Sequence, residues 1–236
     1  TPSSRGLGDV YKRQALLNQG DHMVASADIY GGTYGLLTEE FPRFGISTTM
    51  ADMRDPASYE AAIQENTKLL YIETLTNPVL KVCDIEAMAD VAKRHNLLLL
   101  IDNTFASPWG CKPLDMGVDL VLHSTTKYLG GHSDILGGAV VGSKDLIAQI
   151  FMRKVHFGAA PDPHSCYLLE RGMRTLDVRM PRICDNAYNL AVRLENHPAI
   201  ERVYHSKLAS HPDFEIAERI LPNGSGMIAF VVKGGD

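Results

Sequence analysis

Lys127 has the most specific chemical setting of any residue in this sequence. It stands in the stretch HSTTKYLGGHSD (residues 123–134), between the mostly apolar run 118–122 and the glycine pair at 130–131. A lysine amine placed among hydroxyl groups can form a Schiff base with an aldehyde. A single lysine after a strand is, however, most often a solvated surface residue. Lys127 alone therefore leaves both interpretations open.

Other reactive side chains also follow the ends of apolar runs, two of them in the same stretch as Lys127. They comprise an aromatic residue, an amide, a carboxylate and two hydroxyl residues: Tyr30, Asn77, Asp102, Ser124 and Thr126. In open α/β sheets, ligands bind beyond the carboxyl ends of the strands, so these side chains can meet in one crevice. Each has an ordinary structural explanation as well. An aspartate is most often a helix cap or turn former, Tyr30 fits a half-buried turn, and Asn77 before a proline can merely start a turn.

Together, these residue types match what pyridoxal phosphate requires. This cofactor is an electron sink when its ring nitrogen stays protonated, and a carboxylate such as Asp102 would hold that proton. An aromatic face such as that of Tyr30 stacks on the ring. Hydroxyl groups of the Ser124 and Thr126 type bind the phosphate, and an amide such as that of Asn77 donates to the phenolic oxygen of the ring.

Strands and helices alternate in the part of the sequence that would position these groups. Short apolar runs predict six strands, at residues 22–26, 47–50, 69–73, 97–101, 120–122 and 139–141. Between them, Pro56 marks the start of one helix, and Asp84 caps another whose apolar residues have helical spacing. This alternation predicts a mostly parallel sheet with covering helices.

After residue 141 the pattern becomes mainly helical. It predicts helices from Ser143, from about Pro163 and around residues 187–194, then a strand near Val203, a helix near Ile216 and a strand at 227–232. We expect a cofactor-binding large domain at residues 15–178 and the beginning of an α+β C-terminal domain at 179–236. Residues 1–14 have no apolar core and no periodicity, so we expect a non-native or disordered leader.

From about residue 15 to its end, the sequence resembles the Cys/Met-metabolism pyridoxal-phosphate enzymes, the trans-sulfuration enzymes. The motifs that carry the resemblance are YGGTY (30–34), ETLTNP (73–78), IDNTFASP (101–108), HSTTKYLGGHSD (123–134) and LLERGMRTLDVRM (168–180). The resemblance implies an α/β protein of pyridoxal-phosphate-dependent fold type I, which is the aspartate aminotransferase-like fold. It also implies a homotetramer built from two tight dimers.

The resemblance further implies a role for each matching residue. Lys127 would carry the cofactor as a Schiff base, and Asp102 would pair with the ring nitrogen. Tyr30 would stack on the ring and assist proton transfer to a sulfur leaving group. Asn77 would bond the phenolic oxygen, and Ser124 and Thr126 would contact the phosphate. Lys127 would then move protons between Cα, C4′ and Cβ, which suits a lysine whose pKa is lowered by burial.

The reaction that we expect is cleavage or formation of a C–S bond at Cγ, of the cystathionine γ-lyase or γ-synthase type. Methionine γ-lyases usually have cysteine where this sequence has Gly32, which counts against that activity. O-acetylhomoserine sulfhydrylase, cystathionine β-lyase and methionine γ-lyase remain alternatives within the family. More distant alternatives are another fold type I enzyme, such as an aminotransferase, and a non-catalytic α/β binding module.

Further family residues lie outside the matching part. Before the match begins, the family has a tyrosine and an arginine that reach a neighbouring subunit, and an anion-binding serine-glycine-methionine turn. Its arginine for the substrate carboxylate lies beyond Asp236. Because none of these is in this chain, we expect an internal fragment that is a poor enzyme by itself.

Composition excludes several other classes. The formal net charge of −5 comes without any block of like charge, which argues against binding to nucleic acid or to an anionic membrane. The longest aliphatic run, at residues 97–101, is far below the roughly 20 residues that span a bilayer. The four cysteines and nine histidines show no metal-ligand spacing, so we expect no metal site. Free thiols favour a cytoplasmic protein, and the resemblance implies that its partner is a small sulfur amino-acid substrate.

Overall fold

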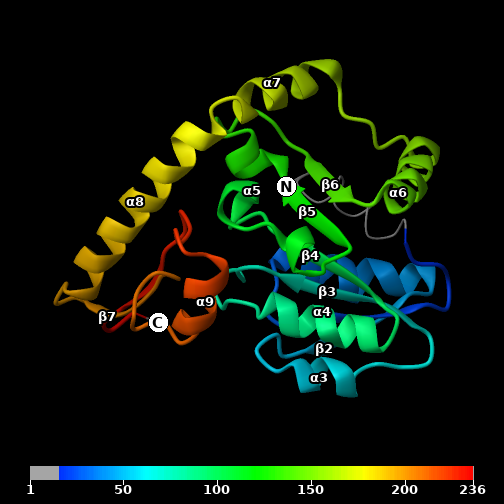
Figure 1. Cartoon of the computed structure of the whole chain (residues 1–236), viewed down its shortest axis with the longest axis horizontal. Helices are drawn as coiled ribbons and strands as arrows, with labels where there is room; N and C mark the ends of the chain where they lie inside the picture. Colours follow the sequence, from blue (N-terminus) through cyan, green and yellow to red (C-terminus); the bar gives the residue numbers. More distant parts are fainter. Residues whose placement is uncertain (1–15, 236) are drawn as a thin grey trace.

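The computed structural model describes residues 16–235, and a six-stranded sheet forms its centre (Figure 1). The strand order is β2-β1-β3-β4-β5-β6; β1 to β5 are mutually parallel, and β6 is antiparallel to β5. The strands are β1 (His22–Ser26), β2 (Ser47–Ala51), β3 (Thr67–Glu73), β4 (Leu98–Asp102), β5 (Leu120–Ser124) and β6 (Gly138–Gly142). All six predicted strands are present to within two residues at either end. The predicted mostly parallel α/β sheet is confirmed.

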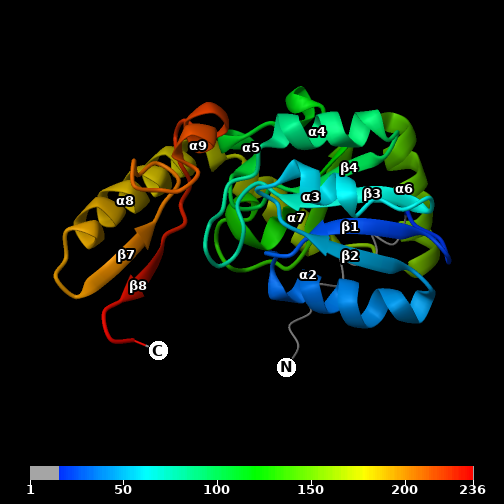
Figure 2. The same cartoon turned by 90° about the horizontal axis from the view of Figure 1, so that it is seen from below.

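Helices cover both faces of this sheet (Figure 2). On one face, Leu70 and Ile72 of β3 share an apolar cluster with Met88 of α4 (Ile85–Arg94). On the other face, Leu69 and Tyr71 cluster with residues from the helical turns after α2 (Gly31–Gly35) and from α6 (Lys144–Phe157). Successive residues of a strand point to opposite faces, so burial on both faces explains the unbroken apolar runs of the sequence.

Most longer helices begin at a residue whose side chain caps the first turn. Asp55 accepts a hydrogen bond from the backbone N–H of Ala57 at 3.0 Å, and Asp84 accepts one from Ala87 at 3.3 Å. Ser143 and Asp162 cap α6 and α7 in the same way. The remaining helices of this part are α3 (Pro56–Ala61), α5 (Ser107–Gly110) and α7 (Pro163–Met173). The helix starts predicted at Pro56, Asp84, Ser143 and Pro163 are confirmed.

The C-terminal part begins with one long helix, α8 (Leu176–Glu195), which contains Pro181. This helix is continuous through residue 178, the predicted end of the large domain, and the division there stays a prediction. An antiparallel pair follows, made of β7 (Ile200–Tyr204) and β8 (Ala229–Val232), with α9 (Phe214–Ile220) between them in sequence. In Figures 1 and 2 this pair and α8 lie to one side of the main sheet.

Helix α9 connects the C-terminal part to the sheet. Its Ala217 and Ile220 belong to the same apolar cluster as Ile85 and Val91 of α4. The C-terminal part is therefore packed against the helix layer and the chain that leaves β3. Across residues 16–235, no helix is both long and apolar enough to cross a membrane. The predicted leader at 1–14 lies outside the described residues.

Candidate active site

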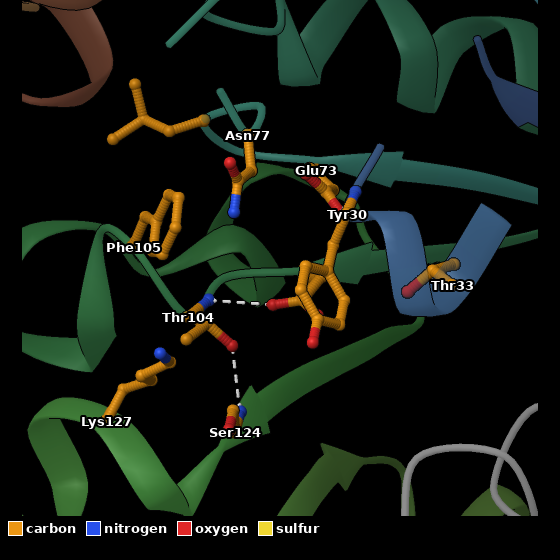
Figure 3. A pocket seen from close by; sticks show the side chains of 10 residues that line it. Tyr30, Thr33, Glu73, Asn77, Thr104, Phe105, Ser124 and Lys127 are labelled. Carbon is orange, nitrogen blue, oxygen red and sulfur yellow. Dashed lines mark hydrogen bonds between the residues drawn. The ribbon is translucent and has the colours of Figure 1, made fainter. Parts of the chain in front are cut away.

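A pocket lies beyond the carboxyl ends of β1, β3, β4 and β5 (Figure 3). Its walls contain ten residues: Tyr30, Thr33, Glu73, Leu75, Asn77, Asp102, Thr104, Phe105, Ser124 and Lys127. Five of the six predicted site residues are among them. The sixth, Thr126, lies in an adjoining hollow, which shares Asn77, Phe105 and Lys127 with the pocket. Residues up to 97 positions apart in sequence, Tyr30 and Lys127, thus line one cavity because the parallel strands end at the same edge.

Lys127 lies on a helical turn, residues 125–129, directly after β5. Its own backbone angles, φ −93° and ψ −124°, depart from helical values within that turn. The side chain extends toward Thr104 in Figure 3. The expectation that this lysine is buried is wrong for the described chain, in which Lys127 is exposed. The physical reason is its place where the pocket and the adjoining hollow meet, because it is then open on two sides.

Asp102 is the last residue of β4 and is half-buried in the pocket wall. Its Oδ1 accepts a hydrogen bond from the backbone N–H of Thr104 at 2.9 Å. This is the local turn contact that aspartate commonly makes. Asp102 is therefore both a turn former and a pocket residue. The turn contact fixes the direction of its carboxylate.

Thr104 is a pocket residue that sequence reasoning did not select. Its Oγ1 accepts a hydrogen bond from the backbone N–H of Ser124 at 2.8 Å, so it joins the end of β4 to the end of β5 (Figure 3). The signal available in the sequence was its position two residues after Asp102 at a strand end. The chain of contacts from Asp102 through Thr104 to Ser124 fixes the floor of the pocket.

Tyr30 precedes α2, and its backbone N–H donates to Oε1 of Glu73 at 3.0 Å. Glu73 ends β3 and is 4% exposed, whereas Tyr30 is 41% exposed. The main chain of Tyr30 is thus anchored in a turn, as the alternative interpretation expected. The aromatic side chain of Tyr30 nevertheless stays accessible at the pocket. Glu73, like Thr104, was not selected from the sequence, because its partner is 43 residues away.

Gly32 lies directly under the Tyr30 ring. A Cβ at this position would be 2.6 Å from Tyr30 Cε1 and 3.2 Å from Cζ. Such distances are well inside carbon–carbon contact, so any larger residue at 32 requires the ring to move. The residue type at position 32 is therefore coupled to the placement of Tyr30.

Asn77 and the two hydroxyl residues occupy different parts of the walls. Asn77 lines both cavities, Ser124 lines the pocket and Thr126 lines the hollow. Thr126 Oγ1 accepts a hydrogen bond from the backbone N–H of Gly137 at 3.2 Å. This contact leaves the hydroxyl hydrogen of Thr126 available as a donor.

The wall of the hollow also contains Arg179 of α8. Its guanidinium donates to the carbonyls of Tyr128 at 2.9 Å and Gly172 at 2.8 Å, and its Nε donates to Thr175 Oγ1 at 3.0 Å. Burial lowers the pKa of Arg179. These contacts give this arginine a structural role in joining α8 to the turn that carries Lys127.

A family model described as Cys/Met metabolism PLP-dependent enzyme matches residues 4–236 of this sequence. The chain belongs to this family. Membership confirms the predicted pyridoxal-phosphate-dependent fold type I and the predicted cofactor class.

Several characterised members of the family are similar to this chain. The L-methionine gamma-lyase of Porphyromonas gingivalis is 43% identical over 237 residues, which cover 99% of this chain and 59% of that protein. The cystathionine gamma-lyase of Bacillus subtilis is 44% identical over 228 residues, which cover 96% of this chain and 60% of that protein. The chain thus spans about three fifths of the length of these relatives.

Solved structures of the family agree with the fold. The crystal structure of cystathionine gamma-lyase from Lactobacillus plantarum complexed with L-serine has a TM-score of 0.93 and 43% identity, covering 96% of this chain and 60% of that one. That of metB from Corynebacterium glutamicum has a TM-score of 0.95 and 40% identity, with 99% and 61% covered. The names of the relatives include γ-lyases, a γ-synthase and β-lyases, so membership by itself does not determine the reaction.

The side chains of the pocket fit pyridoxal phosphate. An amine, a carboxylate, an exposed aromatic ring, an amide and a hydroxyl line one cavity, and a second hydroxyl borders it. This donor and acceptor set matches an aldehyde, a ring nitrogen, a π-face, a phenolic oxygen and a phosphate. Within residues 16–235, no group of three or more His, Cys, Asp or Glu residues could hold a metal ion. The donor and acceptor set of the pocket, together with family membership, indicates pyridoxal phosphate as the cofactor.

Proposed function

We propose that this chain is the cofactor-binding part of a C–S lyase or transferase of sulfur amino-acid metabolism that acts at Cγ, of the cystathionine γ-lyase or γ-synthase type. The observation that carries the proposal is that Lys127, Asp102 and Tyr30 line one pocket at the carboxyl ends of parallel strands. The lyase and synthase names of the relatives support the same reaction class.

In this proposal the pocket residues bind the cofactor, orient it or move protons. Pyridoxal phosphate supplies the electron sink that stabilises negative charge at the substrate carbon. Lys127 holds the cofactor through its Nζ and afterwards moves a proton at Cα of the substrate. Asp102 keeps the ring nitrogen protonated. Its turn contact with Thr104 supports this task, because it keeps the carboxylate oriented without a large conformational cost.

The other residues orient the cofactor and handle the leaving group. The Tyr30 ring stacks on the cofactor, and its hydroxyl exchanges a proton with the sulfur atom that leaves or enters. Asn77 donates to the phenolic oxygen, and the hydroxyls of Ser124 and Thr126 donate to the phosphate. The contact between Thr104 and the Ser124 backbone supports the task of Ser124 by fixing where β5 ends.

Product analysis tests the proposed reaction. The intact gene product, supplied with pyridoxal phosphate and cystathionine, should release cysteine, 2-oxobutanoate and ammonia if it is a γ-lyase. With an activated homoserine ester and cysteine, a γ-synthase should form cystathionine. A requirement for a keto-acid acceptor would contradict the proposal and indicate an aminotransferase. Release of homocysteine, pyruvate and ammonia from cystathionine would identify the β-lyase alternative, whereas methanethiol release from methionine would identify methionine γ-lyase.

The proposal includes a homo-oligomer, with a tetramer as the expected state. Large apolar side chains are exposed along α6 and at the start of α7, where Phe151, Met152, Val155 and Tyr167 are all more than half exposed. An apolar surface of this kind is typical of a protein–protein interface. Light scattering on the intact gene product measures the oligomer size, and Val155→Asp should reduce it if α6 lies in the interface.

We also propose a cytoplasmic location. All four cysteines are free thiols, and Cys83, Cys111 and Cys184 are buried. Burial raises the pKa of Cys111 and that of Cys184 to about 11, which keeps both thiols protonated and unreactive. Reduced, inert thiols suit a reducing compartment. Fractionation of the source cells tests the location directly.

A further inference from the structure

Asn77 lies on a loop, residues 74–84, between β3 and α4; we name it the Asn77 loop. Its two sides are paired like a short hairpin. Thr76 N donates to the Lys81 carbonyl at 3.0 Å, Lys81 N donates to Thr76 Oγ1 at 3.0 Å, and Leu75 pairs with Val82. Because the two sides are joined, a shift of the returning side, residues 80–82, moves Asn77 as well.

The returning side of the Asn77 loop is held by a segment of the C-terminal part. Nε2 of His211 donates to the Leu80 carbonyl at 3.1 Å, and Oδ2 of Asp213 accepts from Val82 N at 3.0 Å. Each contact joins residues 131 positions apart in sequence. Figure 1 shows the chain that leaves β3 running toward α9, which begins directly after Asp213.

Leu80 needs such support because of its conformation. Its φ is +55°, in the left-handed region that costs energy for a residue with a branched side chain, and the residue is 2% exposed. A strained residue keeps such a conformation only when its surroundings impose it. The contacts to its carbonyl and to Val82 N lie on either side of Lys81 and restrain the backbone there.

Asp213 and His211 are themselves fixed by further bonds. Arg54 contacts both carboxylate oxygens of Asp213, with Nε 2.8 Å from Oδ1 and Nη2 2.8 Å from Oδ2. The backbone N–H of Asp213 donates to Nδ1 of His211 at 3.1 Å, so the neutral ring carries its hydrogen on Nε2 and can donate to Leu80. The Asp213 side chain is only 7% exposed, and a bidentate pair in such a place is geometrically strict.

The returning side of the loop also contacts the chain that leads to Tyr30. Lys81 forms an ion pair with Asp28, two residues before Tyr30. The Asn77 loop is therefore held between the chain that leads to Tyr30 and the His211–Asp213 segment. The His211 and Asp213 contacts act on the loop main chain within five residues of Asn77, and they do not involve the Asn77 side chain.

We propose that His211 and Asp213 are positioning residues, which set the place of Asn77 in the pocket by holding residues 80 and 82. The inference rests on the proposed function, because the task of Asn77 is to bond pyridoxal phosphate. In this arrangement the C-terminal part contributes to cofactor affinity without contacting the cofactor. A role in stability alone would affect the whole fold and would be independent of Asn77.

A double-mutant cycle separates the two roles. Asp213→Asn should raise the dissociation constant of pyridoxal phosphate roughly tenfold, equivalent to about 1.4 kcal/mol, measured by absorbance titration of the intact gene product. In an Asn77→Ala background the same substitution should change the constant less than about twofold, because its effect passes through Asn77. An equal loss in both backgrounds, or no loss in either, would overturn the proposal.

Two further variants control for misfolding of Asp213→Asn and for a non-specific effect of losing an ion pair. Arg54→Lys keeps one charge but loses the bidentate contact, so it should shift the constant in the same direction by a smaller factor and still fold if Asp213→Asn does not. Glu60→Gln weakens another bidentate ion pair away from the loop, that of Glu60 with Arg94 at 2.9 Å between α3 and α4, which is more exposed than the Asp213 pair. It should leave the constant unchanged, and a matching loss there would contradict a specific role of Asp213.

Amide hydrogen exchange provides a readout without cofactor. In the cofactor-free protein, Asp213→Asn or Arg54→Lys should speed exchange in the peptide that contains residues 80–82, and Glu60→Gln should not. Unchanged exchange in that peptide would overturn the inference, as would faster exchange without any loss of affinity. If the wild-type protein fails to bind pyridoxal phosphate at all, the proposed function fails, and exchange alone then decides whether this segment holds the loop.

Discussion

Alanine at position 32 tests whether the placement of the Tyr30 ring controls turnover. The new Cβ would lie 2.6 Å from Tyr30 Cε1, whereas carbon atoms in contact are about 3.6 Å apart. The ring must therefore move by about 1 Å. Tyr30 is 41% exposed, so it has room to move and the fold should persist. A misplacement of this size at a reacting centre lowers the rate by up to roughly a hundredfold.

We expect Gly32→Ala to lower kcat/KM by roughly ten- to a hundredfold, measured as thiol release from cystathionine. Gly31→Ala is the matched control, because a Cβ at the adjacent residue meets nothing within 4 Å. Both variants should unfold at nearly the wild-type temperature. Gly32→Cys adds the same Cβ and should act in the same direction. Equal kinetic constants for Gly31→Ala and Gly32→Ala would refute the reasoning, since the ring would then tolerate displacement.

Other substitutions test the remaining assignments. Lys127→Ala should abolish covalent trapping of the cofactor by borohydride reduction and lower turnover at least about a hundredfold; retained trapping would mean that another lysine is used. Asp102→Asn should lower kcat while folding persists, whereas a loss of thermal stability alone would leave Asp102 as a turn former. Tyr30→Phe should keep the cofactor dissociation constant and slow elimination by roughly a hundredfold, whereas normal turnover would limit Tyr30 to packing. Burial lowers the pKa of His205 and of His211 below the usual 6.5. Below about pH 6.5 the unfolded chain therefore binds more protons than the folded one. The free energy of unfolding should be greatest above that pH and should fall on acidification. The fall should be at most about 1.4 kcal/mol per pH unit for each histidine. Thermal unfolding from pH 7.5 to 5 measures this, and an unchanged midpoint in wild type would contradict it.

The strands were predictable because the sheet is buried on both faces. A run such as residues 97–101 stays apolar in any parallel strand with helices on both sides, so composition alone locates it. The start of β3 was harder to predict from the sequence. Thr67 and His22 are polar yet buried, and Thr67 Oγ1 lies 2.8 Å from His22 Nδ1. A contact across 45 residues leaves no local pattern, so the strand was predicted to begin two residues late.

The candidate site likewise contains residues that the sequence predicted and residues that it did not. The rule that ligands bind beyond strand ends selected Lys127, Asp102 and Tyr30, because their positions depend only on where each strand stops. Glu73 accepts a hydrogen bond from the backbone of Tyr30, and Thr104 accepts one from that of Ser124. The sequence does not show such contacts between distant residues. Burial of Lys127 was predicted from its chemistry alone. Exposure depends on the walls around a residue, and for Lys127 those walls open into the adjoining hollow.

The polar links between strand ends explain how the pocket keeps its geometry. Tyr30 is anchored to the end of β3 through Glu73, and Ser124 is anchored to the end of β4 through Thr104. Each anchor is a hydrogen bond from the backbone N–H of the pocket residue to a side chain at or just after the end of the neighbouring strand. Tyr30 and Ser124 are therefore positioned by the strand order β1-β3-β4-β5, each through one hydrogen bond between neighbouring strand ends.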